Sequence, residues 1–165
     1  MKARTATRKI TVILRHSGLT RKGDIVQTTG SDNLLLSAPL LLSVPQMDRE
    51  HAELIGQANE FIGAVDAEAS RAELHMRLAL LIDGFQRHFN SEEGLMRSNS
   101  FPGLQLHSDE HRKLIEQMSG LRDDLGSGIV NRCYALVHFV RLWIGQHITG
   151  PDTDFAHFLH ERIAG

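Results

Sequence analysis

The sequence has a single cysteine and no long hydrophobic run. With only Cys133, the chain cannot form an internal disulfide, which is typical of proteins in a reducing cytoplasm. No stretch approaches the roughly 20 consecutive apolar residues that a membrane-spanning helix needs. With 165 residues, 41% of them hydrophobic, the chain is long enough for one domain with a hydrophobic core. We therefore predict a cytoplasmic protein that does not enter the membrane.

Acidic residues are scarce at the start of the chain. Residues 1 to 46 carry seven Lys or Arg against two acids, a net charge of +5, whereas the remainder carries eleven against eighteen, a net charge of −7. The first segment is rich in Thr, Ser and Gly, so we predict that residues 1–38 form a poorly ordered basic extension and that residues 39–165 form the folded domain. The basic residues are dispersed and lack aromatic partners, which argues against a nucleic-acid-binding arm. The sequence identifies no protein partner for this extension.

Turn and capping signals divide the rest of the chain into helices. Ser43-Val-Pro-Gln46 and Ser70-Arg-Ala-Glu73 match the capping box that begins many helices. Breaks are expected at Phe101-Pro-Gly103, Gly126-Ser-Gly128 and Gly150-Pro151. We predict helices near 44–66, 71–98, 104–125 and 129–149, and a short helical tail near 153–162. The expected fold is all-α: an up-down-up-down antiparallel four-helix bundle with the poorly ordered extension before it and the helical tail after it.

Polar residues interrupt the apolar faces of all four predicted helices. Apolar residues recur at alternating spacings of three and four, the period of a buried helix face. On or beside these faces lie seven residues that can bind a metal: His51, His88, Glu92, His107, His111, His147 and Asp152. Burying so many unpaired polar groups would cost roughly several kcal/mol each, so we infer that a ligand binds them.

The position of these residues along the helices brings them together. His51 lies near the start of the first predicted helix, and His107 and His111 lie near the start of the third. His88 lies near the end of the second helix, and His147 near the end of the fourth. In an up-down-up-down bundle, the starts of odd helices and the ends of even helices meet at one end. The sequence therefore predicts a single metal site there.

Helical spacing identifies which acids belong to this site. His107 and His111 are four residues apart, as are His88 and Glu92, so each pair lies on one helix face and can bind one metal centre. Glu92 is preferred over Glu93 because it lies only about 40° around the helix from His88, against about 140°. Spacing alone leaves Asp152 and Asp154 as alternatives, since Gly150-Pro151 is expected to break the helix before them.

The same arithmetic excludes other histidines of the predicted helices. His75 precedes His88 by thirteen residues, about 220° around the helix, and His138 precedes His147 by nine residues, about 180°. Both are therefore expected to face away from the metal site.

The ligand pattern resembles the hemerythrin family in its bacterial form. The resemblance spans roughly residues 44–160 and rests on four motifs: Met47-Asp48-x-x-His51, His88-Phe89-x-x-Glu92-Glu93-x-x-Met96, His107-x-x-x-His111, and Trp143-Ile144-x-x-His147-Ile148-x-x-x-Asp152. The chain departs from the family in its extension, which lacks the tryptophan that usually precedes the first helix. This departure affects no ligand.

The resemblance implies a non-haem di-iron centre with two Fe ions per chain, cycling between Fe²⁺ and Fe³⁺, and with O₂ as ligand. By this resemblance, His107, His111 and His147 bind one iron, and His51 and His88 bind the other. Glu92, Asp152 and a solvent-derived oxygen would bridge the two, so the resemblance selects Asp152 over Asp154. It also implies an apolar O₂ pocket formed by Leu54, Phe89, Trp143 and Ile144.

The donor set favours reversible O₂ binding over catalysis. Five histidines and two carboxylates suit a bridged pair of Fe ions, although Zn and Mn also bind such donors. Oxygen-activating di-iron bundles instead use four carboxylates with paired Glu-x-x-His motifs, which are missing from these ligand positions. We therefore expect an O₂-binding protein for storage, delivery or scavenging rather than an enzyme. The alternatives are a di-iron enzyme acting on peroxide or nitric oxide, and an oxygen-sensing interaction module.

Overall fold

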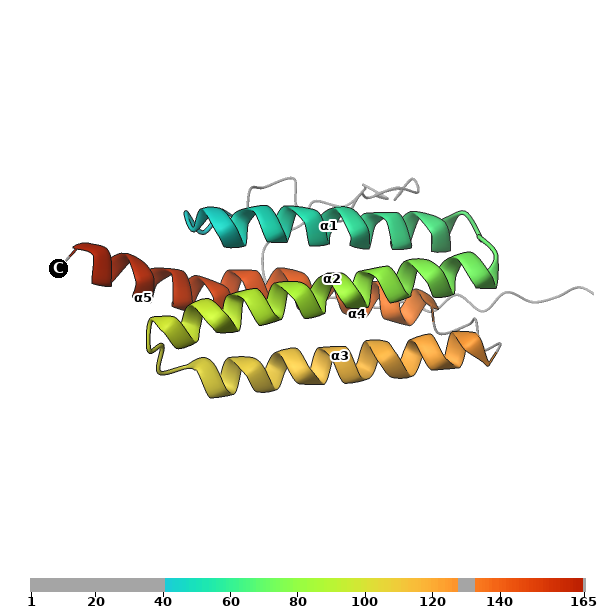
Figure 1. Ribbon diagram of the computed structural model, residues 1–165. Helices are drawn as coiled ribbons and strands as arrows, with labels where there is room; N and C mark the ends of the chain where they lie inside the picture. The colour runs from blue at the N-terminus through green and yellow to red at the C-terminus, as the bar shows by residue number, and fades with distance from the viewer. Residues whose placement is uncertain (1–40, 128–132, 165) are drawn as a thin grey trace, which may run out of the picture. The chain divides into compact units, whose positions relative to one another are not determined.

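The structure is a computed structural model that describes residues 41–127 and 133–164. Within these ranges the elements follow the order α1 (Pro45–Asp66), α2 (Arg71–Ser98), α3 (Leu104–Gly126), α4 (Cys133–His147), the π-helical turn η1 (Ile148–Asp152) and α5 (Thr153–Ala164). Successive helices from α1 to α4 run in opposite directions (Figure 1). The predicted all-α, up-down-up-down bundle is thus confirmed. The predicted extension, residues 1–38, and residues 129–132 of the predicted fourth helix lie outside the described residues.

The two predicted capping boxes have different outcomes. At the start of α2, the Ser70 hydroxyl accepts a hydrogen bond from the backbone N–H of Glu73 at 3.2 Å, as the sequence predicts. At the start of α1 the prediction is wrong: Val44 is the N-cap, and no side chain caps the helix there. Ser43 has a φ of 58°, and the first turn is instead tied to the preceding chain by Asp48, which accepts a hydrogen bond from the N–H of Leu42 at 2.8 Å.

Two tight turns reverse the chain between α1, α2 and α3. In each, one residue after the helix takes a left-handed conformation: Glu68 has a φ of 51° and Ser100 a φ of 55°. The next N–H then bonds to a carbonyl five residues back, Ala69 to Ala64 at 2.9 Å and Phe101 to Met96 at 3.0 Å. This is the Schellman arrangement, which satisfies helix-end carbonyls and turns the chain sharply. The short turns make neighbouring helices antiparallel.

The apolar faces form one core along the bundle and a smaller core at one end. Phe61, Leu78 and Phe85 are among the fully buried side chains of the long core. The smaller core joins the start of α1 and the end of α2 to α5, where Phe155 is fully buried against Met47 and Met96. The predicted tail is therefore a packed helix that covers this end of the bundle. No helix in the described ranges is both long and apolar enough to cross a membrane.

The junction between α4 and α5 differs from the prediction. The sequence predicts that Gly150-Pro151 breaks the helix, whereas the chain passes through η1 directly into α5. Proline has no N–H and cannot complete an α-helical bond, but a single wide turn accommodates this loss. The Thr153 hydroxyl donates to the Ile148 carbonyl at 2.8 Å, bonding across the same five-residue interval. This turn sets the direction of the Asp152 side chain.

Candidate metal centre

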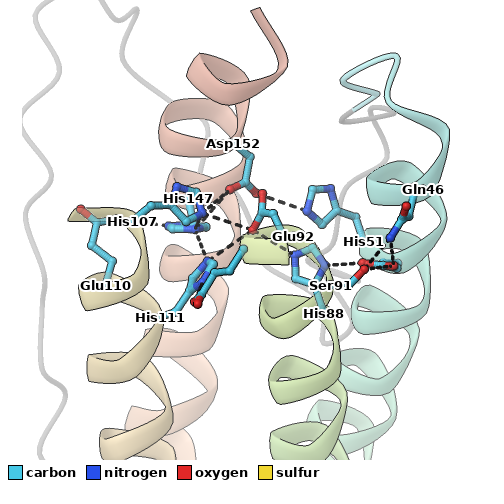
Figure 2. A network of polar contacts seen from close by, with 12 residues as sticks. Gln46, His51, His88, Ser91, Glu92, His107, Glu110, His111, His147 and Asp152 are labelled. Atoms are coloured by element: carbon cyan, nitrogen blue, oxygen red, sulfur yellow. Dashed lines mark hydrogen bonds and ion pairs between the residues drawn. The ribbon is translucent and has the colours of Figure 1, made fainter. Parts of the chain in front are cut away.

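The seven residues singled out in the sequence meet at one end of the bundle. His51 comes from α1, His88 and Glu92 from α2, His107 and His111 from α3, His147 from α4 and Asp152 from η1. Their side chains point toward one another from all sides (Figure 2). All seven are buried, with exposed fractions between 0 and 4%.

The donor atoms form two groups that share a carboxylate. In the first group, Glu92, His107, His111, His147 and Asp152 each offer one donor atom within 4.8 Å of all the others. The second group contains His51, His88 and, again, Asp152. Glu92 also spans both groups, because its Oε2 lies 3.2 Å from Nε2 of His107 and 3.8 Å from Nε2 of His88. Two cations bridged by these carboxylates fit this arrangement.

The π-helical turn places Asp152 in the site. On a continuous α-helix, a residue five positions after His147 would point away from it. A π turn bonds each residue to the fifth one along, which brings Asp152 back over His147. Asp152 Oδ1 lies 3.2 Å from His147 Nε2, and Oδ2 lies 3.2 Å from His51 Nε2. Asp154, the alternative left open by spacing, is exposed.

The arrangement of donors is unfavourable without a cation. Nε2 of His147 lies 2.9 Å from Nε2 of His111 and 3.1 Å from Nε2 of His107, so three ring nitrogens converge on one point. Among the described residues, four further buried atoms of the site lack a hydrogen-bond partner: Nε2 of His51, Oε1 of Glu92 and both carboxylate oxygens of Asp152. Each unsatisfied buried polar atom costs about 1–3 kcal/mol. A pair of metal ions with imidazole and carboxylate preferences, such as iron, fits these donors.

Burial sets the protonation of most of these groups. It lowers the pKa of His51, His88, His111 and His147, so these imidazoles are neutral and can donate a lone pair. Burial also raises the pKa of Glu92, and that of Asp152 to about 7. His107 differs, since the hydrogen bond and charge of Glu92 outweigh its burial and raise its pKa. A cation would replace the protons that these groups share.

Three carboxylates that the sequence analysis missed contact the outer nitrogens of the histidines. Nδ1 of His88 lies 3.0 Å from Oε2 of Glu50, and Nδ1 of His111 lies 2.9 Å from Oε1 of Glu93. Nδ1 of His147 lies 3.3 Å from Oε2 of Glu110. Each of these glutamates is adjacent in sequence to one of the seven site residues, which is the only signal that could have identified them.

An apolar cavity adjoins the second donor group. The cavity has a volume of ≈10 Å³, room for about one water molecule, and it borders His51, His88 and Asp152 of the second group as well as His147 of the first. Leu54, Phe89, Trp143 and Ile144 all line it, as the resemblance implies. Phe89 also stacks on His111, with ring centroids 3.6 Å apart, and Trp143 stacks on His147 at 4.2 Å. The apolar wall therefore packs directly against the imidazoles.

The histidines predicted to face away from the site do so. His138 is exposed on α4, and His75 is half-buried on α2, where its ring lies near Gly126 at the opposite end of the bundle. Neither belongs to the two donor groups.

Comparison with known proteins agrees with the site. Residues 42–159 match the family described as the hemerythrin HHE cation binding domain. The chain is 29% identical to the bacteriohemerythrin of Methylococcus capsulatus over 105 residues, which cover 64% of this chain and 79% of that protein. It is 27% identical to a hemerythrin-like protein of Naegleria gruberi over 110 residues, covering 67% and 80% of the two chains. It is 28% identical to the myohemerythrin of Sipunculus nudus over 76 residues, covering 46% and 58%. The protein belongs to the hemerythrin family and is of the bacterial type.

Proposed function

We propose that the protein binds O₂ reversibly at a non-haem di-iron centre, for oxygen storage, delivery or scavenging. In this proposal His107, His111 and His147 hold one iron, His51 and His88 hold the other, and Glu92 and Asp152 bridge them. The two donor groups and their shared carboxylates support this division. The iron pair would supply the two electrons that O₂ binding and release exchange.

The position of the cavity is the observation that carries this proposal. Two histidines serve the second donor group and three serve the first, so the second iron has fewer protein donors. The small apolar cavity borders both histidines of that second group but only one of the three in the first, His147. A small ligand such as O₂ would therefore find an open coordination position beside an apolar space.

The surrounding residues protect this position from water. Leu54 and Ile144 are buried, with exposed fractions of 6% and 3%, and Phe89 is 4% exposed. An apolar wall of this kind disfavours the charged species that would form if a bound oxygen ligand left with an extra electron. The wall therefore favours release of O₂ itself.

The metal content and the spectrum test this function. The protein isolated from iron-replete cells is expected to hold close to two irons per chain, because seven donors suffice for two ions that share bridges. Metal analysis measures this content. Reduced protein exposed to air should develop an absorption band that disappears again when O₂ is removed. A preparation with mostly zinc, or with one metal per chain, would contradict the di-iron assignment. Steady consumption of peroxide or nitric oxide by the reduced protein would favour an enzyme instead.

We also propose that residues 39–165 suffice for O₂ binding. All seven donors and all cavity residues lie after residue 50. Deleting residues 1–38 is therefore expected to leave the iron content and the O₂-dependent spectrum unchanged. The full-length and shortened proteins would be compared by metal analysis and absorption. A loss of iron in the shortened protein would show that the extension contributes to the metal end.

We propose a cytoplasmic location, and O₂ rather than nucleic acid or a membrane as the partner. The single cysteine, Cys133, is free and buried, as expected for a small core residue in a reducing compartment.

A further inference from the structure

Three glutamates connect the helices of the metal end in a regular order. Glu50 precedes His51 on α1 and contacts His88 on α2. Glu93 follows Glu92 on α2 and contacts His111 on α3. Glu110 precedes His111 on α3 and contacts His147 on α4. Each of α1, α2 and α3 therefore supplies a carboxylate that holds a histidine of the next helix.

These contacts determine which ring nitrogen carries the proton. An ionised carboxylate can only accept hydrogen bonds, so the Nδ1 atom that faces it must be the protonated one. The Nε2 atom of the same neutral ring is then left with its lone pair. In His88, His111 and His147, Nε2 is the nitrogen that faces the donor groups. The glutamates thus select the tautomer that can bind a metal.

The acceptors are themselves held in place. The Ser91 hydroxyl donates to Oε1 of Glu50 at 2.7 Å, and the Gln46 amide donates to the same oxygen at 3.2 Å, while Oε2 faces His88. Burial of Glu50 raises its pKa, but the hydrogen bonds from Ser91, His88 and Gln46 outweigh burial and lower the pKa overall. Both oxygens of Glu50 are therefore engaged as acceptors, Oε1 by Ser91 and Gln46 and Oε2 by Nδ1 of His88.

The histidine of α1 provides a contrast. Nδ1 of His51 is buried and has no hydrogen-bond partner in the described part of the chain. Because α1 is the first helix of the described residues, the order of contacts among them begins with Glu50. The second donor group thus contains one imidazole whose Nδ1 meets a carboxylate, His88, and one, His51, that contacts a carboxylate only through Nε2.

We propose that Glu50, Glu93 and Glu110 are positioning residues that fix the Nδ1-protonated tautomers of His88, His111 and His147 and strengthen their donation to the metal centre. A carboxylate that accepts the Nδ1–H hydrogen bond raises the basicity of the imidazole. Its Nε2 atom is then a better metal donor, which favours the ferric state. The glutamates therefore raise iron affinity and lower the midpoint potential of the centre. This inference rests on the proposed di-iron function.

Glutamine substitutions test the inference, because glutamine keeps the length of the side chain but removes its charge. It can also turn its NH₂ group toward Nδ1, so it no longer selects the tautomer. Glu50→Gln, Glu93→Gln and Glu110→Gln are each expected to weaken Fe²⁺ binding by about 10- to 100-fold, the usual cost of losing such a partner. Alanine at the same positions should weaken binding at least as much. Anaerobic competition with a chelator measures the affinity, and a redox titration of the iron-loaded protein should show a raised midpoint potential.

Glu53→Gln is the matched control for Glu50→Gln. Glu53 is exposed on α1 and lines the same outer cavity as Glu50 and His88, of ≈220 Å³, but contacts no imidazole. Its substitution removes the same charge nearby and should leave iron affinity within about twofold and the midpoint potential unchanged, since exposed charges interact weakly. Circular dichroism checks that each variant keeps its helices. The target side chains are 21–38% exposed, so the substitutions leave the apolar core unchanged.

Two results would overturn the inference. The first is an iron affinity and a midpoint potential in the three glutamine variants that equal those of the wild type. The second is a change in Glu53→Gln as large as that in Glu50→Gln, which would mean that only the net charge matters. If the wild-type protein itself failed to bind two irons, the proposed function would fail first. Unchanged variants of a protein that does bind two irons would reject the positioning role alone.

Discussion

Replacing His111 with alanine is expected to abolish or severely reduce iron binding, whereas replacing His138 with alanine leaves it unchanged. His111 is 2% exposed, and its Nε2 lies in the first donor group, 2.9 Å from Nε2 of His147 and 3.4 Å from Oε2 of Glu92. Removing the His111 imidazole takes one of three histidines from the first donor group and leaves the neighbouring donor atoms without that partner. His138 is exposed on the opposite face of α4. Metal analysis of the purified variants gives the iron content.

Thermal stability provides a second measurement on the same variants. A metal present at 100 times its dissociation constant stabilises the folded state by about 2.7 kcal/mol. For a domain of this size, that loss lowers the melting temperature by roughly 5 to 10 °C. His107→Ala should behave as His111→Ala does, and His75→Ala as His138→Ala does. If His138→Ala lost iron as badly as His111→Ala, the assignment of helix faces would be wrong.

The sequence predicts the location of the metal site because two rules bring the same residues together. The spacing of residues on each helix sets which of them face the core, and the order of the helices sets which ends meet. For His88 and Glu92, or His107 and His111, the first rule depends only on local helix geometry. The structure accordingly brings the predicted residues together. The assignment of individual iron ligands remains a prediction until a metal-loaded protein is measured.

Asp152 shows where local rules stop being sufficient. A proline after a glycine normally ends a helix, and this rule predicts a break at Gly150-Pro151. In the fold, the π-helical turn η1 accommodates the hydrogen bond that the proline cannot make, and the Thr153 hydroxyl bonds to the Ile148 carbonyl. The burial of Phe155 in the smaller core stabilises α5 as a continuation of the helix at this end of the bundle. The energy of that packing is not visible in the local sequence.

The outer glutamates show a second limit. Glu50, Glu93 and Glu110 are polar residues next to site residues, and on any single helix they look like ordinary surface acids. Their role depends on the crossing of adjacent helices, which brings each acid to the histidine of the next helix. Spacing along one helix contains no information about that distance.

Ile144→Ala is expected to keep both irons but to shorten the lifetime of the O₂-bound protein. Ile144 lies about one turn before His147, is 3% exposed and lines the small cavity beside His51 and His88. Truncation enlarges this cavity beyond the size of one small molecule and lets water approach the centre. We expect conversion to the inert diferric protein to accelerate about tenfold, which corresponds to about 1.4 kcal/mol of activation free energy. Stopped-flow oxygenation followed by absorption over time measures the conversion rate.

Two further variants separate the cavity from general destabilisation. Truncating a buried leucine or isoleucine to alanine costs about 2–5 kcal/mol wherever it lies in a core. Leu136→Ala does this on the same helix, at a position that is 1% exposed and does not line the cavity, so it should lower stability without accelerating the conversion. Ile144→Val removes less volume and should accelerate it less than Ile144→Ala. Equal rates in Ile144→Ala and wild type, at equal iron content, would mean that Ile144 only packs the core. The protection from water would then have to come from the other apolar residues of the same wall: Leu54, Phe85, Phe89, Trp143 and Ile148.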